Sequence, residues 1–406
     1  MRGQVPFRLL VVRLGAMGDI LHALPAVTAL RRAHPGWQID WAVEPQWMPL
    51  LAVEGPASST ELPRSASRPL VDKLFVVPAK QWSRQPLSRQ TLRDILTLRR
   101  QLREGGYDAV IDMQGSVRSG IVARFTGCRR IIGEETPREP IAKWLFSERV
   151  ATCGVHVIEQ DIELAAAVAG DELMYAPAVL PYDEAAEEWC DVLEGEMFGT
   201  ARSPVLLIHP GAGWGAKRWP VDRYGVVAEE FAQRGGVSLV SAGPGEEELA
   251  NGVVEAAHGF ATMVRCSIAE LIALTRRVSV VVGGDTGPLH LACALERPVV
   301  GIYGPTEPNR NGPFGTKFIV LRNPESRRDH TRREEPEAGL LTIMPKAVMT
   351  AVMELLLHER TVHESEPEQT GGQVLMIDHG QARQGQARQS QTRQDKTRSA
   401  DEARFS

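Results

Sequence analysis

A carboxylate lies among small residues where the first apolar run of the chain gives way to a helical pattern. In RLGAMGDI (13–20), Asp19 follows Gly15, Ala16 and Gly18. A carboxylate at a helix start can cap backbone N–H groups, or it can act as a general base that removes a proton from a hydroxyl. The small residues, Gly18 included, would leave room for a substrate. Both interpretations of Asp19 stay open on this stretch alone.

A second helix start has the residues of an anion site, in SVVVGGDTGPLHLACALERPVVGIYGP (279–305). The strand predicted at 279–282 ends at two glycines, and Asp285 and Thr286 occupy positions expected of helix caps. A helix start beyond the carboxyl end of a parallel strand presents unpaired N–H groups, which suits a diphosphate. His290 would lie on the first turn, near that anion. The pattern is also typical of a capped strand-to-helix connection in any α/β protein.

Two glycine-rich turns could complete such a site. In HPGAGWGAKRWP (209–220), backbone N–H groups could approach a phosphate closely, and Lys217 would add a point charge; a flexible loop with a solvated lysine is the alternative. The spacing is not that of a P-loop. In SAGPGEEE (241–248), Glu246 could accept hydrogen bonds from ribose hydroxyls, or it could stabilise a helix dipole.

Residues 64–103 are strongly basic, with ten Lys and Arg against Asp72 and Asp94, and with Trp82 among them. This density fits an anionic acceptor or a membrane surface. A solvated helix face explains much of it equally well.

The composition is that of an ordinary globular protein with two domains, since 406 residues exceed one core and 43% of them are hydrophobic. A net charge of −5 argues against nucleic acid as a partner. The five cysteines lack C-x-x-C spacing, which argues against a disulfide framework or zinc site and favours a reducing compartment. The sequence contains no run of 18 uncharged apolar residues, so we expect no segment to span a membrane.

The order of elements predicts two doubly wound, Rossmann-like α/β domains that face a central cleft. Strands are predicted at 7–15, 39–47, 73–79 and 107–115, then at 204–213, 237–245, 261–266, 278–285 and 298–305. The first domain is predicted to span 1–182 and the second 183–343. A helix at 344–360 is expected to pack back toward the first domain, and 361–406, rich in Gln, Arg and Ser, is expected to be disordered.

Taken together, these motifs resemble the ADP-heptose:lipopolysaccharide heptosyltransferases of glycosyltransferase family 9, over about residues 7–358. The resemblance rests on RLGAMGDILHALPA (13–26), YDAVIDMQGSVRS (107–119), PREPIA (137–142), KRWP (217–220), GPGEEE (243–248) and GDTGPLHLACALERPVVGIYGPTEP (284–308). The opening motif is most similar to heptosyltransferase I. The loop HPGAGWGAK is more similar to heptosyltransferase II, and Gly15 and Ala16 replace serines common in heptosyltransferase I.

The resemblance implies a GT-B fold and inverting transfer of heptose from ADP-heptose to Kdo of Kdo-lipid A, without metal or cofactor. It implies a cytoplasmic enzyme peripheral to the inner membrane, with Asp19 as general base. Donor-binding residues would be Gly211, Ala212, Gly213, Lys217, Glu246, Asp285, Thr286, Gly287 and His290. Acceptor-binding residues would be Gly18, Lys80, Arg84, Arg118 and Arg138. Alternatives are heptosyltransferase II, another family 9 transferase with a different acceptor or donor sugar, or a non-catalytic nucleotide-sugar-binding module.

Overall fold

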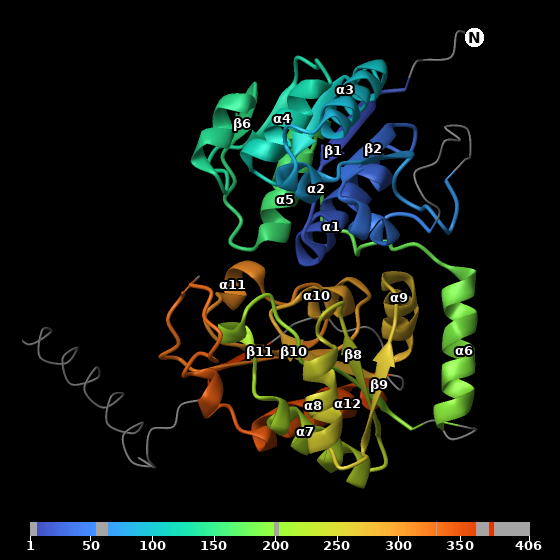
Figure 1. Cartoon of the computed structure of the whole chain (residues 1–406), viewed down its shortest axis with the longest axis vertical. Coiled ribbons are helices and arrows are strands. Elements are labelled where there is room, and N and C mark those ends of the chain that lie inside the picture. The colour runs from blue at the N-terminus through green and yellow to red at the C-terminus, as the bar shows by residue number, and fades with distance from the viewer. Residues whose placement is uncertain (1–5, 54–63, 199–202, 330, 363–372, 377–406) are drawn as a thin grey trace, which may run out of the picture. The chain divides into compact units, whose positions relative to one another are not determined.

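Two parallel sheets with helices packed against them form the chain (Figure 1). The computed structural model describes residues 6–53, 64–198, 203–329, 331–362 and 373–376, and its residues up to Met376 belong to one compact unit. In spatial order the first sheet contains β3 (Lys73–Val76), β2 (Gln38–Val43), β1 (Arg8–Val12), β4 (Ala109–Asp112), β5 (Ile131–Glu134) and β6 (Glu148–Val150). The second contains β13 (Gln373–Met376), β12 (Phe318–Arg322), β11 (Val299–Tyr303), β10 (Val280–Gly284), β7 (Val205–His209), β8 (Val237–Ala242) and β9 (Ala261–Arg265).

Helices connect the strands, as parallel pairing requires. Those of the first half are α1 (Met17–Ala33), α2 (Ala79–Arg84), α3 (Arg89–Glu104), α4 (Val117–Phe125) and α5 (Val157–Ala169), with 3₁₀ turns η1 (Pro45–Leu50) and η2 (Pro140–Leu145). Those of the second are α6 (Glu184–Phe198), α7 (Val221–Gln233), α8 (Glu247–Ala256), α9 (Ile268–Arg277), α10 (Gly287–Ala294), α11 (Pro308–Asn311) and α12 (Pro345–Val362), with η3 (Gly215–Lys217) and η4 (Leu340–Thr342). None of the described helices has the length and apolar character needed to cross a bilayer.

Strand β1 is buried on both faces, as its continuous apolar run predicts. Leu9 and Val11 belong to one core cluster, whereas Leu10 and Val12 belong to the cluster on the opposite face. This alternation follows from the two-residue period of a strand. Because both faces are packed, the catalytically useful groups of β1 are confined to the turn after its carboxyl end.

The nine predicted strands are all present, with shorter bounds. The prediction that the glycines end the strand at 282 is wrong, since Gly283 and Gly284 belong to β10. A Cβ on Gly283 would lie 3.1 Å from the His209 carbonyl oxygen, so the missing side chain allows close packing there. Strand β12 was not predicted, although its FIVLR sequence is apolar and β-branched.

Two predictions about the C-terminal region are wrong. Helix α12 packs against α7 and strands β10 to β12 of the second half, not toward the first domain, because Val348 and Val352 bury its apolar stripe there. The region predicted to be disordered from 361 contains the end of α12 and strand β13, which pairs in parallel with the open edge of β12. The rest of that prediction, at 363–372 and 377–406, lies outside the described residues.

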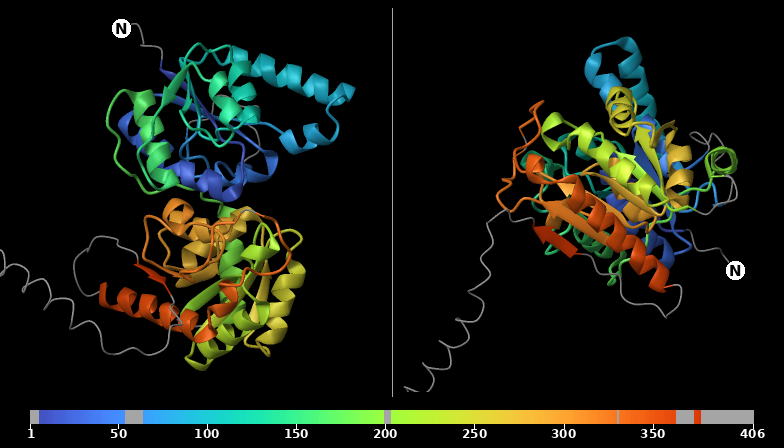
Figure 2. Two further views of the ribbon diagram at one scale, coloured as in Figure 1. Left: turned by 90° about the vertical axis from the view of Figure 1, so that its left-hand side faces the viewer. Right: turned by 90° about the horizontal axis from the view of Figure 1, so that it is seen from below.

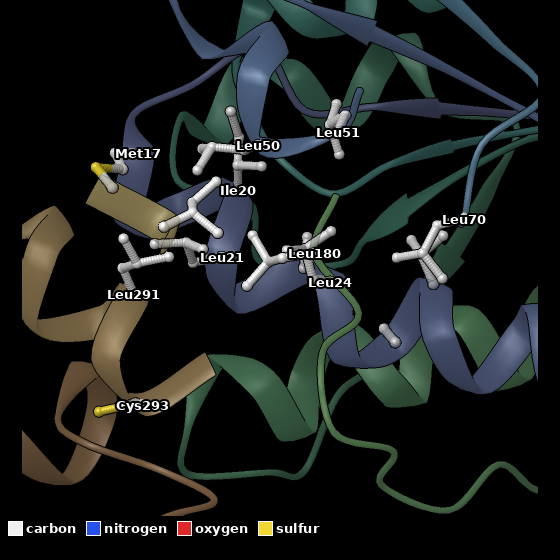
Figure 3. Packing of buried hydrophobic residues seen from close by; sticks show 14 of the residues in the cluster. Met17, Ile20, Leu21, Leu24, Leu50, Leu51, Leu70, Leu180, Leu291 and Cys293 are labelled. Atoms are coloured by element: carbon white, nitrogen blue, oxygen red, sulfur yellow. The ribbon is translucent and has the colours of Figure 1, made fainter. Parts of the chain in front are cut away.

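The two halves meet where α1 packs against α10. Figure 3 shows Met17, Ile20 and Leu21 of α1 directed toward Leu291 of α10. All four side chains are buried in one cluster that includes residues from both sheets. The start of α1, which carries Asp19, is thereby brought to the start of α10.

Candidate active site

The predicted donor side of the site forms at the carboxyl edge of the second sheet. Strands β7 and β10 are parallel neighbours with Gly283 beside His209, so the turns that follow them emerge together. This places Lys217 Nζ 2.5 Å from Asp285 Oδ2. Both side chains are only 10% exposed, which contradicts the alternative of a solvated lysine on a flexible loop.

Asp285 joins Lys217 to His290 and is not a helix cap. His290 Nε2 lies 3.1 Å from Asp285 Oδ1, so each carboxylate oxygen has its own partner. Burial alone would raise the pKa of Asp285, but the hydrogen bond from His290 and the charge of Lys217 outweigh it and hold the pKa well below its usual value. Asp285 is therefore ionised at neutral pH and fixed from two sides.

The first turn of α10 is left without a side-chain cap. Thr286 is the N-cap residue, but its hydroxyl donates back to the Gly284 carbonyl oxygen at 3.3 Å and accepts nothing from the helix. Gly287 is the first helical residue. Backbone N–H groups that lack an intrahelical partner are thus available to a ligand, and the helix dipole favours an anion there.

Glu246 lies under the loop that follows β7. Its Oε2 accepts a hydrogen bond from the Gly243 N–H at 3.2 Å, and His209 Nε2 lies 3.5 Å from the same oxygen. Burial raises the pKa of Glu246, and burial lowers the pKa of His209 to about 4, so His209 is neutral at pH 7. Glu246 occupies the N-cap position of α8, and its side chain makes no capping hydrogen bond.

The glycine-rich loop is shaped by close packing at one end and is open at the other. A Cβ on Gly211 would collide with the Glu246 carboxylate, and Ala212 is buried. Among the described residues, no atom other than those of its chain neighbours lies within 4 Å of the position that a Gly213 Cβ would take. The Lys217 ammonium lies 4.6 Å from the centre of the Trp214 ring. Gly213 is therefore the point at which a phosphate could approach the backbone.

Asp19 is held at the start of α1 by the backbone and by two arginines. Its Oδ2 accepts a hydrogen bond from the Ala16 N–H at 3.1 Å, so Asp19 does cap a backbone N–H group at the helix start. Arg13 Nη2 lies 3.2 Å from Oδ1, and Arg138 Nη1 lies 4.0 Å from Oδ2. The carboxylate nevertheless remains 34% exposed, so it can reach a substrate.

Gly18 does not leave room for a substrate, contrary to the prediction. A Cβ there would lie 2.8 Å from His290 Cδ2, and a Cβ on Gly287 would lie 2.7 Å from Met17 Sδ. The space over Gly15 is likewise filled by the Trp47 ring. The small residues instead allow α1 and α10 to approach closely, so the residue that precedes Asp19 in the chain lies against His290.

Three of the four basic residues predicted for the acceptor side gather at the carboxyl edge of the first sheet. Lys80 Nζ and Arg118 Nη1 lie 3.7 and 3.9 Å from the two oxygens of Glu44, and Arg138 lies beside Asp19. Each is at least half exposed. Arg84 is exposed at the end of α2. The edge is thus a cationic rim around two carboxylates.

Three further residues of this region were not among the predicted site residues. Arg13 is buried against Asp19, Glu44 is buried beneath Lys80 and Arg118, and His22 contacts His290. Arg13 and His22 lie on either side of MGD (17–19) and could have been found as polar residues, one directly after an apolar strand and one on an apolar helix. Glu44 is a single carboxylate after a strand and carries no comparable signal.

Residues 95–341 match the sequence profile of "Glycosyltransferase family 9 (heptosyltransferase)". The lipopolysaccharide heptosyltransferase 1 of Pseudomonas aeruginosa is 31% identical over 77% of this chain and 83% of its own length. The chain belongs to glycosyltransferase family 9. The proteins of the same name from Salmonella typhimurium and Escherichia coli K12 are both 29% identical, over 78% of this chain and 95% and 94% of their own. This confirms the resemblance found in the sequence, and the protein is a glycosyltransferase.

Solved structures of family 9 proteins share the fold. E. coli heptosyltransferase WaaC with ADP aligns with a TM-score of 0.68 at 24% identity, covering 86% of this chain and all of WaaC. The glycosyltransferase family 9 structure from Veillonella parvula aligns with a TM-score of 0.71 at 21% identity, over 87% and 97% of the two chains. The predicted GT-B architecture of two Rossmann-like halves is confirmed.

Proposed function

We propose that this family 9 enzyme transfers L-glycero-D-manno-heptose from ADP-heptose to Kdo of Kdo-lipid A, with inversion and without a metal ion. One observation carries the proposal. Gly18, which directly precedes Asp19 in the chain, packs against His290 of the Lys217–Asp285–His290 cluster. The helix start that carries the proposed base thus packs against the helix start proposed to bind the anion, which suits a transfer from a nucleotide sugar to a hydroxyl. The names of the relatives, lipopolysaccharide heptosyltransferase 1, support heptose as the transferred sugar and lipopolysaccharide as the product.

In the proposed reaction, Asp19 accepts the proton of the acceptor hydroxyl as its oxygen attacks the anomeric carbon. The bond from that carbon to the β-phosphate oxygen breaks on the opposite face, and ADP leaves with the bonding electrons. The Lys217 ammonium and the uncapped N–H groups at the start of α10 stabilise the charge on the leaving diphosphate. Attack opposite the leaving group inverts the anomeric centre.

The cationic rim of the first half suits an acceptor that carries carboxylates and phosphates. Lys80, Arg118 and Arg138 are more than half exposed, and their present partners, Glu44 and Asp19, lie at 3.7 to 4.0 Å. The three basic side chains are exposed and their contacts are long, so they are accessible to an anionic ligand. We assign these residues, with Arg84, to acceptor binding.

The base assignment is tested with Asp19→Asn, which keeps the capping oxygen but cannot take a proton. We expect turnover to fall by about 10²- to 10⁴-fold, the usual contribution of a general base, while ADP affinity stays unchanged. Asp94→Asn on α3, a carboxylate that hydrogen-bonds Gln90 on the same helix, is the matched control. Near wild-type turnover of Asp19→Asn would exclude this residue as the base.

The loop HPGAGWGAK favours a second candidate, a transferase of the heptosyltransferase II type. A panel of sugar nucleotides assayed with Kdo-lipid A and with monoheptosylated Kdo-lipid A separates the two. Product only from the heptosylated acceptor would replace the first proposal by the second. If no sugar nucleotide gives a product with either acceptor, the chain is better explained as a non-catalytic nucleotide-sugar-binding module.

We further propose that the enzyme works at the cytoplasmic face of the inner membrane, and that α3 contacts the bilayer. Figure 2 shows α3, in light blue, extending outward from the first half. Thr91, Leu98 and Leu102 face the core, whereas Leu92 and Leu96 are 49% and 62% exposed. These leucines lie one turn apart among exposed arginines, namely Arg89, Arg93 and Arg100. Interleaved leucine and arginine fit an anionic lipid surface.

Flotation with vesicles tests this surface. The wild type should float with vesicles containing phosphatidylglycerol, and less so with phosphatidylcholine alone or at high salt. Leu92→Ser with Leu96→Ser should reduce flotation several-fold, whereas Val192→Ser, at a 61% exposed position on α6, should not. If the double leucine variant floats as well as Val192→Ser, the membrane contact lies on a surface other than α3.

A further inference from the structure

Two buried histidines meet across the contact between the two halves of the enzyme. His22 of α1 and His290 of α10 are 6% and 5% exposed, and His22 Nε2 lies 3.2 Å from His290 Nδ1. Their ring centres are 4.4 Å apart with the planes at 67°, which directs one nitrogen of each ring toward the other. The pair lies in the same α1–α10 contact that Gly18 and Gly287 make possible.

The pair continues a line of polar groups that starts at the donor side. The second nitrogen of His290, Nε2, lies 3.1 Å from Asp285 Oδ1, and Asp285 Oδ2 contacts Lys217. Because Asp285 is ionised, it can only accept, so His290 Nε2 must carry a hydrogen. The nitrogen that faces His22 is therefore the one that determines the protonation form of His290.

His22 can complement either form of His290. Burial lowers the pKa of His22 well below its ordinary value, and the charge of Arg13 lowers it further against the opposing effect of Asp285. A neutral His22 can donate from Nε2 to a neutral His290, or accept there from a protonated one. In both cases it fixes the plane and the direction of the His290 ring.

We propose that His22 is a positioning residue of the donor site, supplied by the opposite half of the enzyme. It holds His290 against Asp285 at the uncapped start of α10, where the diphosphate of the donor is proposed to bind. The diphosphate site is then complete only while α1 lies against α10, so donor binding and the contact between the halves depend on each other. This inference rests on the proposed assignment of that helix start to an ADP-linked donor.

His156 offers a matched comparison within the same contact. It is also buried, its Nε2 lies 3.0 Å from the carbonyl oxygen of Gly312 in the second half, and its ring centre is 5.7 Å from that of His22. Its partner is a backbone oxygen and not a residue of the Lys217–Asp285–His290 cluster. Loss of either histidine removes a polar contact between the halves, but only loss of His22 releases His290.

The test compares His22→Leu, His22→Gln and His156→Leu by calorimetric titration with ADP, by donor and acceptor kinetics, and by thermal unfolding. We expect His22→Leu to weaken ADP binding and to raise the donor KM by about tenfold, with the acceptor KM unchanged. His22→Gln should recover most of this, because an amide can donate to or accept from His290 Nδ1. His156→Leu should lower the unfolding temperature similarly but keep ADP affinity within about twofold.

Three results would overturn the proposal: wild-type ADP affinity in His22→Leu, equal loss of affinity in His156→Leu, or no ADP binding by the wild type. ADP titration needs neither donor sugar nor acceptor, so it separates the two proposals. If His22→Leu weakens ADP binding while no heptose is transferred to any acceptor, the positioning role stands and the proposed function fails. If heptose is transferred and His22→Leu binds ADP normally, the proposed function stands and the positioning role of His22 fails.

Discussion

Arg13 fixes the candidate base Asp19 through two separate contacts. Its Nη2 lies 3.2 Å from the carboxylate Oδ1, and its Nε donates to the main-chain oxygen of the same residue at 3.1 Å. The arginine is itself buried, and its carbonyl oxygen accepts a hydrogen bond from Trp41 Nε1 at 3.0 Å. The carboxylate is thus oriented by a rigid fork that is anchored in the core.

We expect Arg13→Lys to lower kcat about tenfold while leaving ADP affinity unchanged, because lysine keeps the charge but cannot make both contacts at once. Steady-state kinetics and ADP titration check this. Arg31→Lys is the matched control, since Arg31 is a buried arginine of the same half that pairs with Asp72 at 2.6 Å. That variant should lose stability but not turnover. Equal kcat losses in both variants would point to a general structural effect.

The Lys217 ammonium makes a testable contribution to donor binding. Lys217→Gln should weaken ADP binding by about 10- to 100-fold, since it removes a charge-assisted contact worth roughly 1.5–3 kcal/mol from the proposed phosphate site. Titration with ADP and, in parallel, with adenosine measures the effect on the phosphates alone. Adenosine affinity should not change, and neither should ADP affinity in Lys346→Gln, at an exposed position on α12. Unchanged ADP affinity in Lys217→Gln would refute the assignment.

Much of the fold could be predicted from local sequence patterns, because a strand that is buried on both faces has a short apolar sequence that ends in a glycine-rich turn. Asp19, Lys217 and Asp285 were found for the same reason, since each follows such a strand within a few residues. The contact between Lys217 and Asp285 was not predicted, because it depends on β7 and β10 being neighbours in the sheet, which neither motif encodes.

The contacts between the halves could not be predicted. The proximity of His22 and His290 depends on how α1 packs against α10, and no period or spacing within either segment encodes that register. For the same reason Gly18 was assigned to substrate access, although it accommodates His290. The edge position of β13 was missed because its four residues follow a polar segment and pair only through a distant strand.

Metal independence is tested by removing divalent ions. In the proposed mechanism Lys217 and the start of α10 supply the positive charge that the leaving diphosphate requires, so dialysis against EDTA should leave the transfer rate within about twofold. Elemental analysis of the dialysed enzyme confirms that ions have been removed. A large loss of rate that Mg²⁺ or Mn²⁺ restores would replace this part of the mechanism by a metal-assisted one.

Asp161 of α5 should make the stability of the enzyme depend on pH. Its side chain is buried, and its Oδ2 has no hydrogen-bond partner among the described residues. Burial raises the pKa of Asp161 to about 7. The charges of Asp19 and Glu134 also raise this pKa, whereas the charge of Arg13 lowers it. The folded state therefore holds a proton that the unfolded state releases near pH 4. The contribution of Asp161 to the free energy of unfolding is therefore fully present below about pH 4 and is lost as the pH rises through about 7.

Asp161→Asn removes this dependence and keeps the shape of the side chain. Relative to the wild type, the variant should become progressively more stable between pH 5 and 8, with a limiting difference of up to about 4 kcal/mol over the whole titration, at 1.36 kcal/mol for each unit of pKa. Denaturant unfolding across this range measures the difference, and Asp171→Asn, at an exposed position, is the control. A difference between Asp161→Asn and the wild type that stays constant with pH, or that decreases as the pH rises, would show that Asp161 is already ionised in the folded enzyme and is neutralised by Arg13.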